Sequence, residues 1–447
     1  MRRLAASSLL GGTLAALLAI SSWVHGDVPK RDLPDYDGTG EPPATPGGGA
    51  TIALRVLLSP VYLVTEYLLR RPLGALIAGA ERSGLPEVLY DFFAFGPDHK
   101  AGIIPIFYID FGFRPTFGLY AFWNDAFVPR HDLRLRGTVG PDTLVLGFGD
   151  RVRLSSDPYD RIVVEGDASR RPDYKYYGLG PSSLQSARLL FGADILEART
   201  GADGRLWRSS SIHGRVGVRS LDFRRGGIHG QALLEDAVAA GTVPPPPGYP
   251  NTHHLGFVSM SGAFDTRQKN APDGSGIRVE VDGAYTSDLQ YSGQSWVGWG
   301  GAAGVFIDVT GTHRVVSLSA NTHFIDPVSD ATIPFTELVS LGGNHPMRGY
   351  VTGRLRDRSA VVWELGYRWP VWIWLDGSMR FEVGNVFGPG LGGFDPGLLR
   401  FSGSIGVEST GSPDNSLQIL FGVGSETFAS GGKIDSFRVL LGTTHGF

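Results

Sequence analysis

The feature that most constrains this chain is a two-residue alternation of apolar and polar side chains, which runs from about residue 100 to the C-terminus. In the segment IIPIFYIDFGFR, Ile103 and Ile109 fall on one face, and Tyr108 and Asp110 fall on the other. The same period returns in VVWELGYRWPV and in the segment that follows it. Such alternation is typical of β-strands with one face in an apolar environment.

A soluble β-sandwich would alternate in the same way, so other features must separate it from a membrane barrel. Four tryptophans stand near the predicted strand ends, where a transmembrane barrel carries its aromatic girdle: Trp363, Trp369, Trp372 and Trp374. The polar faces carry charges, which a wet lumen permits. We therefore predict an all-β fold over residues 99–447, a transmembrane antiparallel β-barrel of about 16 strands.

The N-terminus has the layout of a secretory signal. Arg2 and Arg3 precede an apolar run from Leu9 to Ile20, which is followed by small and polar residues up to Gly26. The apolar run is shorter than the roughly 20 residues that span a bilayer, so the pattern favours a signal peptide at 1–26 over a membrane anchor. Export permits disulfides, but the chain contains no cysteine, so packing and hydrogen bonding must hold the fold.

Two further segments precede the barrel. Residues 27–50 are rich in proline, glycine and acidic residues and predict a disordered periplasmic leader. Residues 51–98 predict short amphipathic helices, with a kink at Pro60 and with Arg55, Ser59, Glu66 and Arg70 near one face. We expect these helices to be too short and interrupted to span a membrane. Either they lie at the periplasmic membrane–water boundary or they pack on the barrel.

Residues 336–357 read TELVSLGGNHPMRGYVTGRLRD and resemble the lumenal loop of BamA/TamA-type outer-membrane assembly barrels, the bacterial surface antigen family. In that family a loop preceded by glycines folds back into the lumen and carries a V/I/M-R-G-F/Y tip. Five alternating segments follow the loop here, as in the family's sixteen-stranded barrels, at about 357–369, 372–387, 398–409, 415–425 and 435–447. The matching loop residues are Gly342, Gly343, Met347, Arg348, Gly349 and Tyr350.

The resemblance implies that Arg348 is held by acidic residues on the two strands after the loop. Glu364 and Glu382 stand at the matching positions, with Glu in place of the usual Asp at the second. The strand alternation independently places both carboxylates on the lumenal face, and a guanidinium can fork onto carboxylates. A weaker match is DYKYYGLG at residues 173–180, which resembles the family's F/Y-Y-G-x-G segment.

The chain ends on an alternating strand, as outer-membrane barrels generally do when they present a C-terminal signal to the barrel assembly machinery. The resemblance therefore names that machinery as the partner for the protein's own insertion. The residues in phase on this strand are Phe437, Val439, Leu441 and Phe447.

The function that the resemblance implies is assistance in the insertion or translocation of proteins or lipids at the bacterial outer membrane. Its partners would be outer-membrane lipids and unfolded outer-membrane proteins or lipid clients, and no cofactor or metal is implied. The best-known members carry periplasmic POTRA domains ahead of the barrel. Residues 27–98 lack the strand and helix pattern of such a module, so we expect none here, which weakens the expectation of an assembly role.

Two alternatives were weighed. The first is a passive or gated channel in which the loop is the plug and Asp376, Arg380, Arg368 and Arg400 line the lumen. The second is an enzyme, which we do not expect because no Gly-x-Ser-x-Gly elbow, His-Glu-x-x-His motif or thiol is present. The net charge of −4 and the lack of a basic stripe argue against nucleic acid as a partner.

Overall fold

The structure is a computed structural model that describes residues 49–447 apart from 228–229, 269–273, 329, 411–415 and 445–447. The predicted signal peptide, nearly all of the predicted leader and Phe447 lie outside the described residues.

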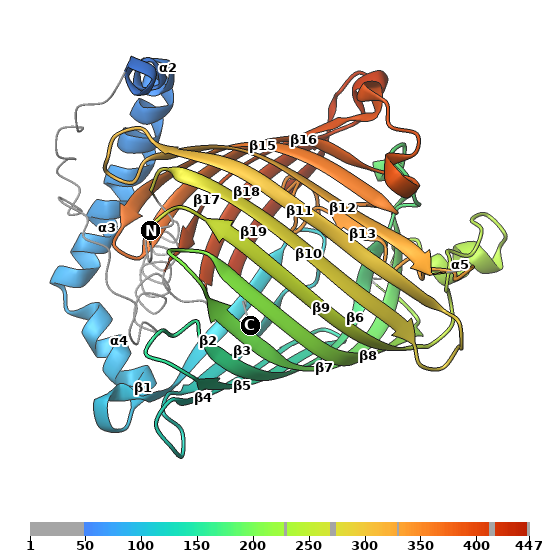
Figure 1. The fold of residues 1–447 in the computed structure, drawn as a ribbon, viewed down its shortest axis with the longest axis horizontal. Coiled ribbons are helices and arrows are strands. Elements are labelled where there is room, and N and C mark those ends of the chain that lie inside the picture. The colour runs from blue at the N-terminus through green and yellow to red at the C-terminus, as the bar shows by residue number, and fades with distance from the viewer. Residues whose placement is uncertain (1–48, 228–229, 269–273, 329, 411–415, 445–447) are drawn as a thin grey trace, which may run out of the picture.

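Sixteen antiparallel strands close into a barrel, which confirms the predicted fold class (Figure 1). Each strand pairs with its neighbour along the chain, and β19 returns to β2. A two-residue strand, β1 (Ala94–Phe95), adds to the edge of β2. The barrel strands are β2 (Ala101–Asp110), β3 (Thr116–Trp123), β4 (His131–Gly140), β5 (Thr143–Arg153), β6 (Arg161–Tyr176), β7 (Leu189–Arg205), β8 (Ser211–Arg224), β9 (His253–Asp265), β10 (Gly276–Asp288), β11 (Ser295–Asp308), β12 (Val315–Val328), β15 (Ser359–Trp372), β16 (Leu375–Phe387), β17 (Arg400–Ser409), β18 (Ser416–Ser425) and β19 (Ile434–Thr444).

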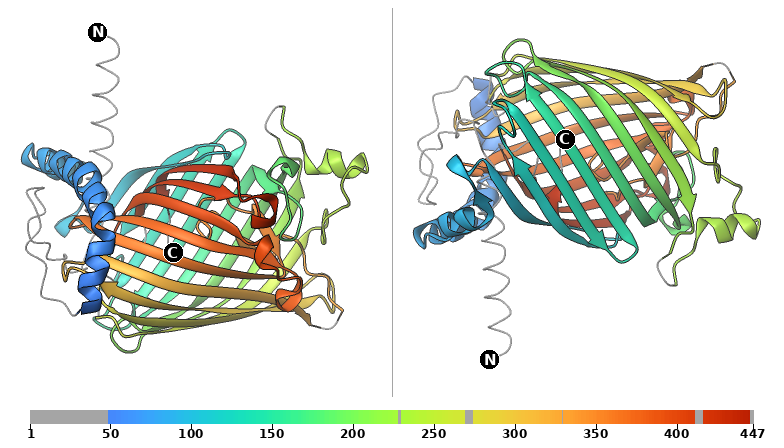
Figure 2. Two further views of the ribbon diagram at one scale, coloured as in Figure 1. Left: turned by 90° about the horizontal axis from the view of Figure 1, so that it is seen from above. Right: turned by 90° about the horizontal axis from the view of Figure 1, so that it is seen from below.

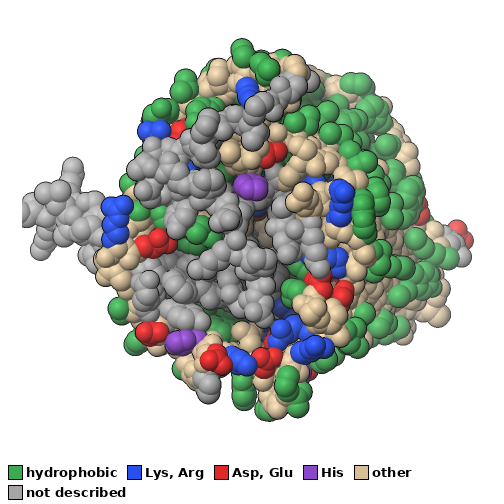
Figure 3. Space-filling view, turned by 60° about the vertical axis from the view of Figure 1, so that its left-hand side comes forward, with side chains coloured by type: hydrophobic (Ala, Val, Ile, Leu, Met, Phe, Trp, Pro, Cys, Tyr) green, Lys and Arg blue, Asp and Glu red, His purple; other side chains and the backbone are tan. Residues whose placement is uncertain are grey.

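The barrel wall is apolar outside and charged inside, as the alternation predicts. Outward side chains such as Leu119, Val218 and Leu318 are exposed, whereas Arg151 and Glu165 are buried in the lumen. Figure 3 shows hydrophobic side chains over the wall and charged side chains around the rim. A wall with this polarity fits a bilayer on its outer side.

The two ends of the barrel differ. Short turns join the strands at one end, and long connections such as 177–188, 225–252 and 329–358 join them at the other. Buried aromatic residues, including Tyr176, Phe191 and Phe335, pack together at the long-loop end. The shorter elements are α5 (Leu234–Ala239), β13 (Val339–Leu341), β14 (Leu355–Asp357) and the 3-10 turns η2 (Pro97–His99), η3 (Gln185–Ala187), η4 (Pro389–Leu391), η5 (Pro396–Leu398) and η6 (Phe428–Ser430).

The helical segment lies across the short-turn end of the barrel (Figures 1 and 2). It consists of α2 (Gly49–Val64), a π-helical turn η1 (Thr65–Arg70), α3 (Arg71–Arg82) and α4 (Leu85–Phe93). The expectation that it is too short and interrupted to span was wrong as regards length, because Thr51–Arg82 forms a 32-residue helix that is long and apolar enough to cross a membrane. Its contacts nevertheless lay it along the barrel.

Helix α2 continues through Pro60. A proline has no N–H to offer to the carbonyl four residues earlier, here that of Val56. The hydroxyl of Ser59 donates to that carbonyl instead, at 2.8 Å. The helical irregularity falls one turn later, at Thr65–Arg70.

Candidate functional site

The loop between β12 and β15 folds back into the lumen, as predicted. Strands β13 and β14 pair to form its base, and Met347 and Tyr350 at its tip are fully buried. The tip is a tight turn in which the N–H of Tyr350 donates to the carbonyl of Met347 at 3.0 Å. Gly342 takes φ +95°, and a Cβ there would lie 2.6 Å from the Val351 carbonyl oxygen, so the turn needs glycine at this position.

The side chain of Glu382 holds the tip of the loop by accepting hydrogen bonds from the backbone of the tip. Its two carboxylate oxygens accept the N–H groups of Met347 at 2.6 Å and Arg348 at 2.8 Å. The hydroxyl of Ser402 donates to the same carboxylate at 2.8 Å and accepts the N–H of Gly349 at 2.9 Å. Three consecutive N–H groups are therefore directed at one buried anion and its hydroxyl partner, an arrangement that resembles an anion-binding nest.

The Arg348 side chain does not bind as predicted. Its guanidinium lies 3.7 Å from the carboxylate of Glu408 on β17, and this is its one ion pair among the described residues. Glu364 pairs with Arg380 instead, at 3.5 Å. The structure thus brings Glu382 to the loop but not Glu364. The sequence pattern thus predicts the carboxylate that binds the loop, Glu382, but not the atoms that it binds. These are backbone N–H groups and not the guanidinium of Arg348.

The tip packs on two glycines of β18. A Cβ on Gly424 would overlap the ring of Tyr350, and a Cβ on Gly422 would come within 2.8 Å of the Cα of Gly349. The hydroxyl of Tyr350 donates to the carbonyl of Ser425 at the end of this strand. Burial raises the pKa of this tyrosine, which lies in the loop, to about 12, so the hydroxyl remains a donor. The sequence signal for this contact is the GVG of β18.

Among the described residues, the seam between the first and last strands is the shortest strand pairing in the barrel. Strand β19 pairs with β2 at three positions, Leu440 with Asp110, Leu441 with Ile109 and Gly442 with Tyr108. The other neighbouring barrel strands pair over at least seven positions. Among the described residues, 103–107 of β2 pair only with β3.

A buried ion pair crosses this seam. The guanidinium of Arg438 on β19 donates to both oxygens of Asp110 on β2, at 3.0 and 2.9 Å, and both side chains are fully buried. The same guanidinium donates to the loop carbonyls of Gly343 at 2.6 Å and Arg348 at 3.2 Å. Arg438 therefore links the first strand, the last strand and the loop. Sequence reasoning missed it, although strand parity places both charges on the lumenal face.

A second contact holds the loop to the connection after β6. The buried guanidinium of Arg354 donates to the hydroxyl and the carbonyl of Ser183, both at 2.9 Å, and lies over the ring of Tyr177. The N–H of Gly180 donates to the Arg356 carbonyl at 3.0 Å. The YYGLG segment thus packs on the loop.

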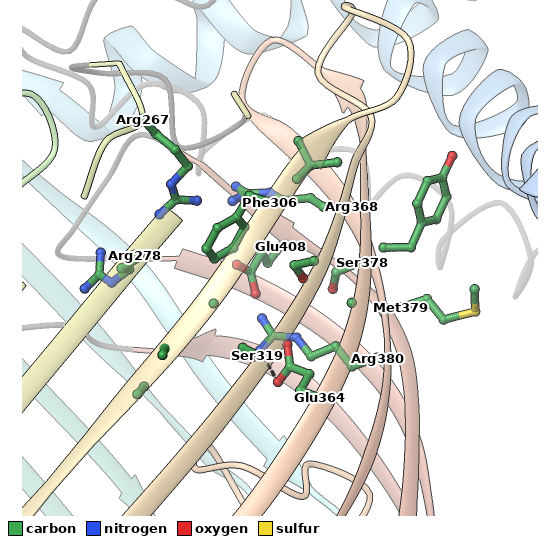
Figure 4. Close-up of a pocket in the computed structure, with 17 residues that line it drawn as sticks. Arg267, Arg278, Phe306, Ser319, Glu364, Arg368, Ser378, Met379, Arg380 and Glu408 are labelled. Atoms are coloured by element: carbon green, nitrogen blue, oxygen red, sulfur yellow. Dashed lines mark hydrogen bonds and ion pairs between the residues drawn. The ribbon is translucent and has the colours of Figure 1, made fainter. Parts of the chain in front are cut away.

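A charged recess of about 300 Å³ opens in the lumen toward the short-turn end (Figure 4). Arg380 and Glu364 face each other in it, and Arg368 bonds to Asp376 beside it. Arg400, which the channel alternative expects to line the lumen, is buried and donates to the Ser183 and Pro181 carbonyls. Within the described part of the chain, no group of three or more metal-ligating side chains is placed to hold an ion.

The C-terminal strand keeps the predicted phase. Phe437 is exposed on the outer wall, and Val439 and Leu441 are half-buried in the same row.

No model of a known protein family matches the chain, and no curated protein is significantly similar in sequence. Among solved structures, BamA from Haemophilus ducreyi lacking POTRA domains 1–3 matches with a TM-score of 0.53 and 14% identity, over 77% of this chain and 70% of that one. CdiB from Escherichia coli gives 0.49 and 12%, over 78% and 64%. CdiB from Acinetobacter baumannii gives 0.46 and 12%, over 77% and 60%. The fold of this chain is therefore that of a sixteen-stranded outer-membrane barrel of the BamA type.

Proposed function

We propose that the protein assists the insertion or translocation of proteins or lipids at the bacterial outer membrane by a non-covalent mechanism that opens the β2–β19 seam. Its partners would be outer-membrane lipids and unfolded barrel proteins or lipid clients. Because short turns face the periplasm in such barrels, the helical segment lies on the periplasmic side.

The observation that carries the proposal is the three-position pairing between β19 and β2. An exposed strand edge can template an incoming strand through its main-chain N–H and carbonyl groups. Among the described residues, 103–107 of β2 have no strand partner on the side away from β3 and so offer such an edge. Opening the rest of the seam requires the loss of few backbone hydrogen bonds, and the Arg438 and Asp110 pair then becomes the main restraint.

A reversible lock across the seam tests this role. The chain has no cysteine, so Ile109→Cys with Leu441→Cys would create a single defined disulfide between opposed residues. In cells depleted of the wild-type protein, the oxidised variant should leave the same deficit in the outer-membrane protein or lipid inventory as depletion itself. Reduction should restore the inventory.

The matched control places a disulfide across a fully paired interface. Leu318 and Leu365 are opposed on β12 and β15 and are exposed on the outer wall, so Leu318→Cys with Leu365→Cys should leave activity intact. Full activity of the locked seam, or an unchanged inventory after depletion, would contradict the proposal.

The charged recess favours a channel as the second candidate, because a cavity of about 300 Å³ whose lining includes several charged side chains lies in the lumen beside the loop. Planar-bilayer conductance separates the two functions. A pore that opens in Glu382→Gln, in which the loop loses its anchor, would support a plugged channel. A barrel that stays closed in that variant would argue against one.

A further inference from the structure

From α2 through η1 the helical segment has a polarity that is reversed relative to a helix of a water-soluble protein, whereas α3 buries Gly74, Ile77 and Ala78 against the barrel. Its buried residues in η1 are Thr65, Glu66 and Arg70. Its outward residues are large and apolar, with Leu57 73% and Leu68 69% exposed. In water, a surface helix buries its apolar stripe and exposes its charges.

The segment packs on the outer wall of the barrel. Tyr367 and Trp369 belong to the same outward row of β15 as Trp363 and Leu365, which are 41% and 48% exposed. Tyr367 and Trp369 are only 6% and 0% exposed, because Ile77 and its helical neighbours cover them. Figure 2 shows the helices crossing the ends of these strands. The helical segment therefore covers part of the outer barrel wall, the surface that faces lipid in a transmembrane barrel.

Charged groups fix the helix to the barrel. Glu66 accepts bonds from Arg70 at 3.0 Å, from Arg71 at 3.1 Å and from Arg314 of the barrel at 2.6 Å. Arg314 is fully buried and also donates to the Tyr367 hydroxyl at 3.0 Å. Charges in an apolar layer face the protein interior and pair with one another, as these do.

The helix also satisfies its own backbone where it is irregular. The Ser59 hydroxyl bonds to the Val56 carbonyl beside Pro60, and the Thr65 hydroxyl bonds to the Val61 carbonyl at 2.9 Å where the π-turn begins. In hydrocarbon, a carbonyl released from the helical ladder needs a partner within the protein, because no water is available.

From these observations we propose that Gly49–Arg82 is immersed in the periplasmic leaflet of the bilayer, anchored by the Glu66 and Arg314 pair, and that lipid acyl chains cover its outward face. Only 11% of its most apolar stretch is buried in the protein, which leaves that face for lipid. The apolar barrel wall continues on the extracellular side of the helix, at Trp363 and Leu365, so the two surfaces share one apolar layer.

The test uses the full-length protein in vesicles of phosphatidylethanolamine and phosphatidylglycerol. Since the chain has no cysteine, single spin labels can be placed by Leu57→Cys and Leu68→Cys. Both labels should favour oxygen over a water-soluble nickel chelate by the same factor as a label at Leu318→Cys on the outer wall. A label at Arg225→Cys, in an exposed long-loop position, gives the aqueous reference. Labels at 57 and 68 that behave like the Arg225→Cys reference would overturn the proposal.

The anchor has its own test. Glu66→Gln removes the carboxylate that pairs with Arg70 and with Arg314 of the barrel, so the label at Leu68→Cys should become more mobile while the barrel keeps its heat-modifiable migration on gels. Unchanged label mobility in a folded barrel would overturn the anchoring role of Glu66. Arg82→Gln, a charge removal at the end of the same helical run, is the matched control and should leave the label unaffected.

Discussion

Arg438 and Asp110 join the last strand to the first by two hydrogen bonds of 3.0 and 2.9 Å, at the place where backbone pairing is shortest. A side-chain ion pair involves fewer contacts than a long row of backbone hydrogen bonds between strands. Closure of the barrel at this seam therefore depends strongly on these two residues. Because the same guanidinium bonds to two loop carbonyls, we expect the loop to move when the proposed opening of the seam occurs.

We predict that Arg438→Met destabilises the barrel by about 3–5 kcal/mol, because the buried Asp110 carboxylate loses its guanidinium partner and keeps only the bond from the Tyr108 hydroxyl among the bonds described. Removing both charges, by Arg438→Met with Asp110→Asn, should cost less than the Arg438 change alone. Urea unfolding in vesicles and a double-mutant cycle measure both effects. Arg170→Met, which removes an exposed ion pair with Asp194, should change little. Equal losses for Arg438→Met and Arg170→Met would contradict the role of the seam pair.

The two carboxylates that the sequence treated alike should behave differently. Glu382→Gln loses a charged acceptor for two N–H groups, which is worth about 1.5–3 kcal/mol for each hydrogen bond to a charged group. Hydrogen exchange of the Met347 and Arg348 amides should therefore speed up by more than tenfold. Glu364→Gln weakens the ion pair with Arg380 but removes no hydrogen-bond acceptor from the tip, so it should leave these amides protected. Similar exchange rates in both variants would instead support the arrangement predicted from the sequence, in which Glu364 and Glu382 both hold the loop.

The sequence predicted the strand alternation, a count of about 16 strands and the loop, because each has a local pattern. It also predicted the last five strands nearly in place, as in β16 at Leu375–Phe387 against the expected 372–387. It did not predict how the tip is bound. Whether a carboxylate meets a guanidinium or a backbone N–H depends on a few ångströms of loop position, which the packing of Tyr350 against Gly424 sets. Strand parity fixes the face of a residue but not its partner.

We predict that Gly424→Ala displaces the ring of Tyr350 and costs about 1–3 kcal/mol, as expected for overpacking. The reason is that the added methyl would overlap the ring, and the Ser425 and Phe401 carbonyls near the hydroxyl leave it little freedom. The control is Gly262→Ala on β9, where a Cβ would meet nothing within 4 Å. Urea unfolding compares the two, and equal stability of both variants would show that the tip can shift without cost.

The Tyr350 hydroxyl should give the loop a pH dependence above neutrality. Its pKa is raised to about 12 by burial, whereas an unfolded tyrosine titrates at about 10. The folded state therefore keeps its proton longer, so this group's stabilisation is complete below pH about 10 and is lost as the pH rises to about 12. Tyr350→Phe should unfold more easily at neutral pH, by about 0.5–1.5 kcal/mol for one lost hydrogen bond, because the Ser425 carbonyl keeps its bond from Arg400. It should also lose less stability than the wild type between those two pH values, as measured by urea unfolding at each pH. Parallel pH profiles for the two proteins would show that the hydroxyl ionises equally easily in both states.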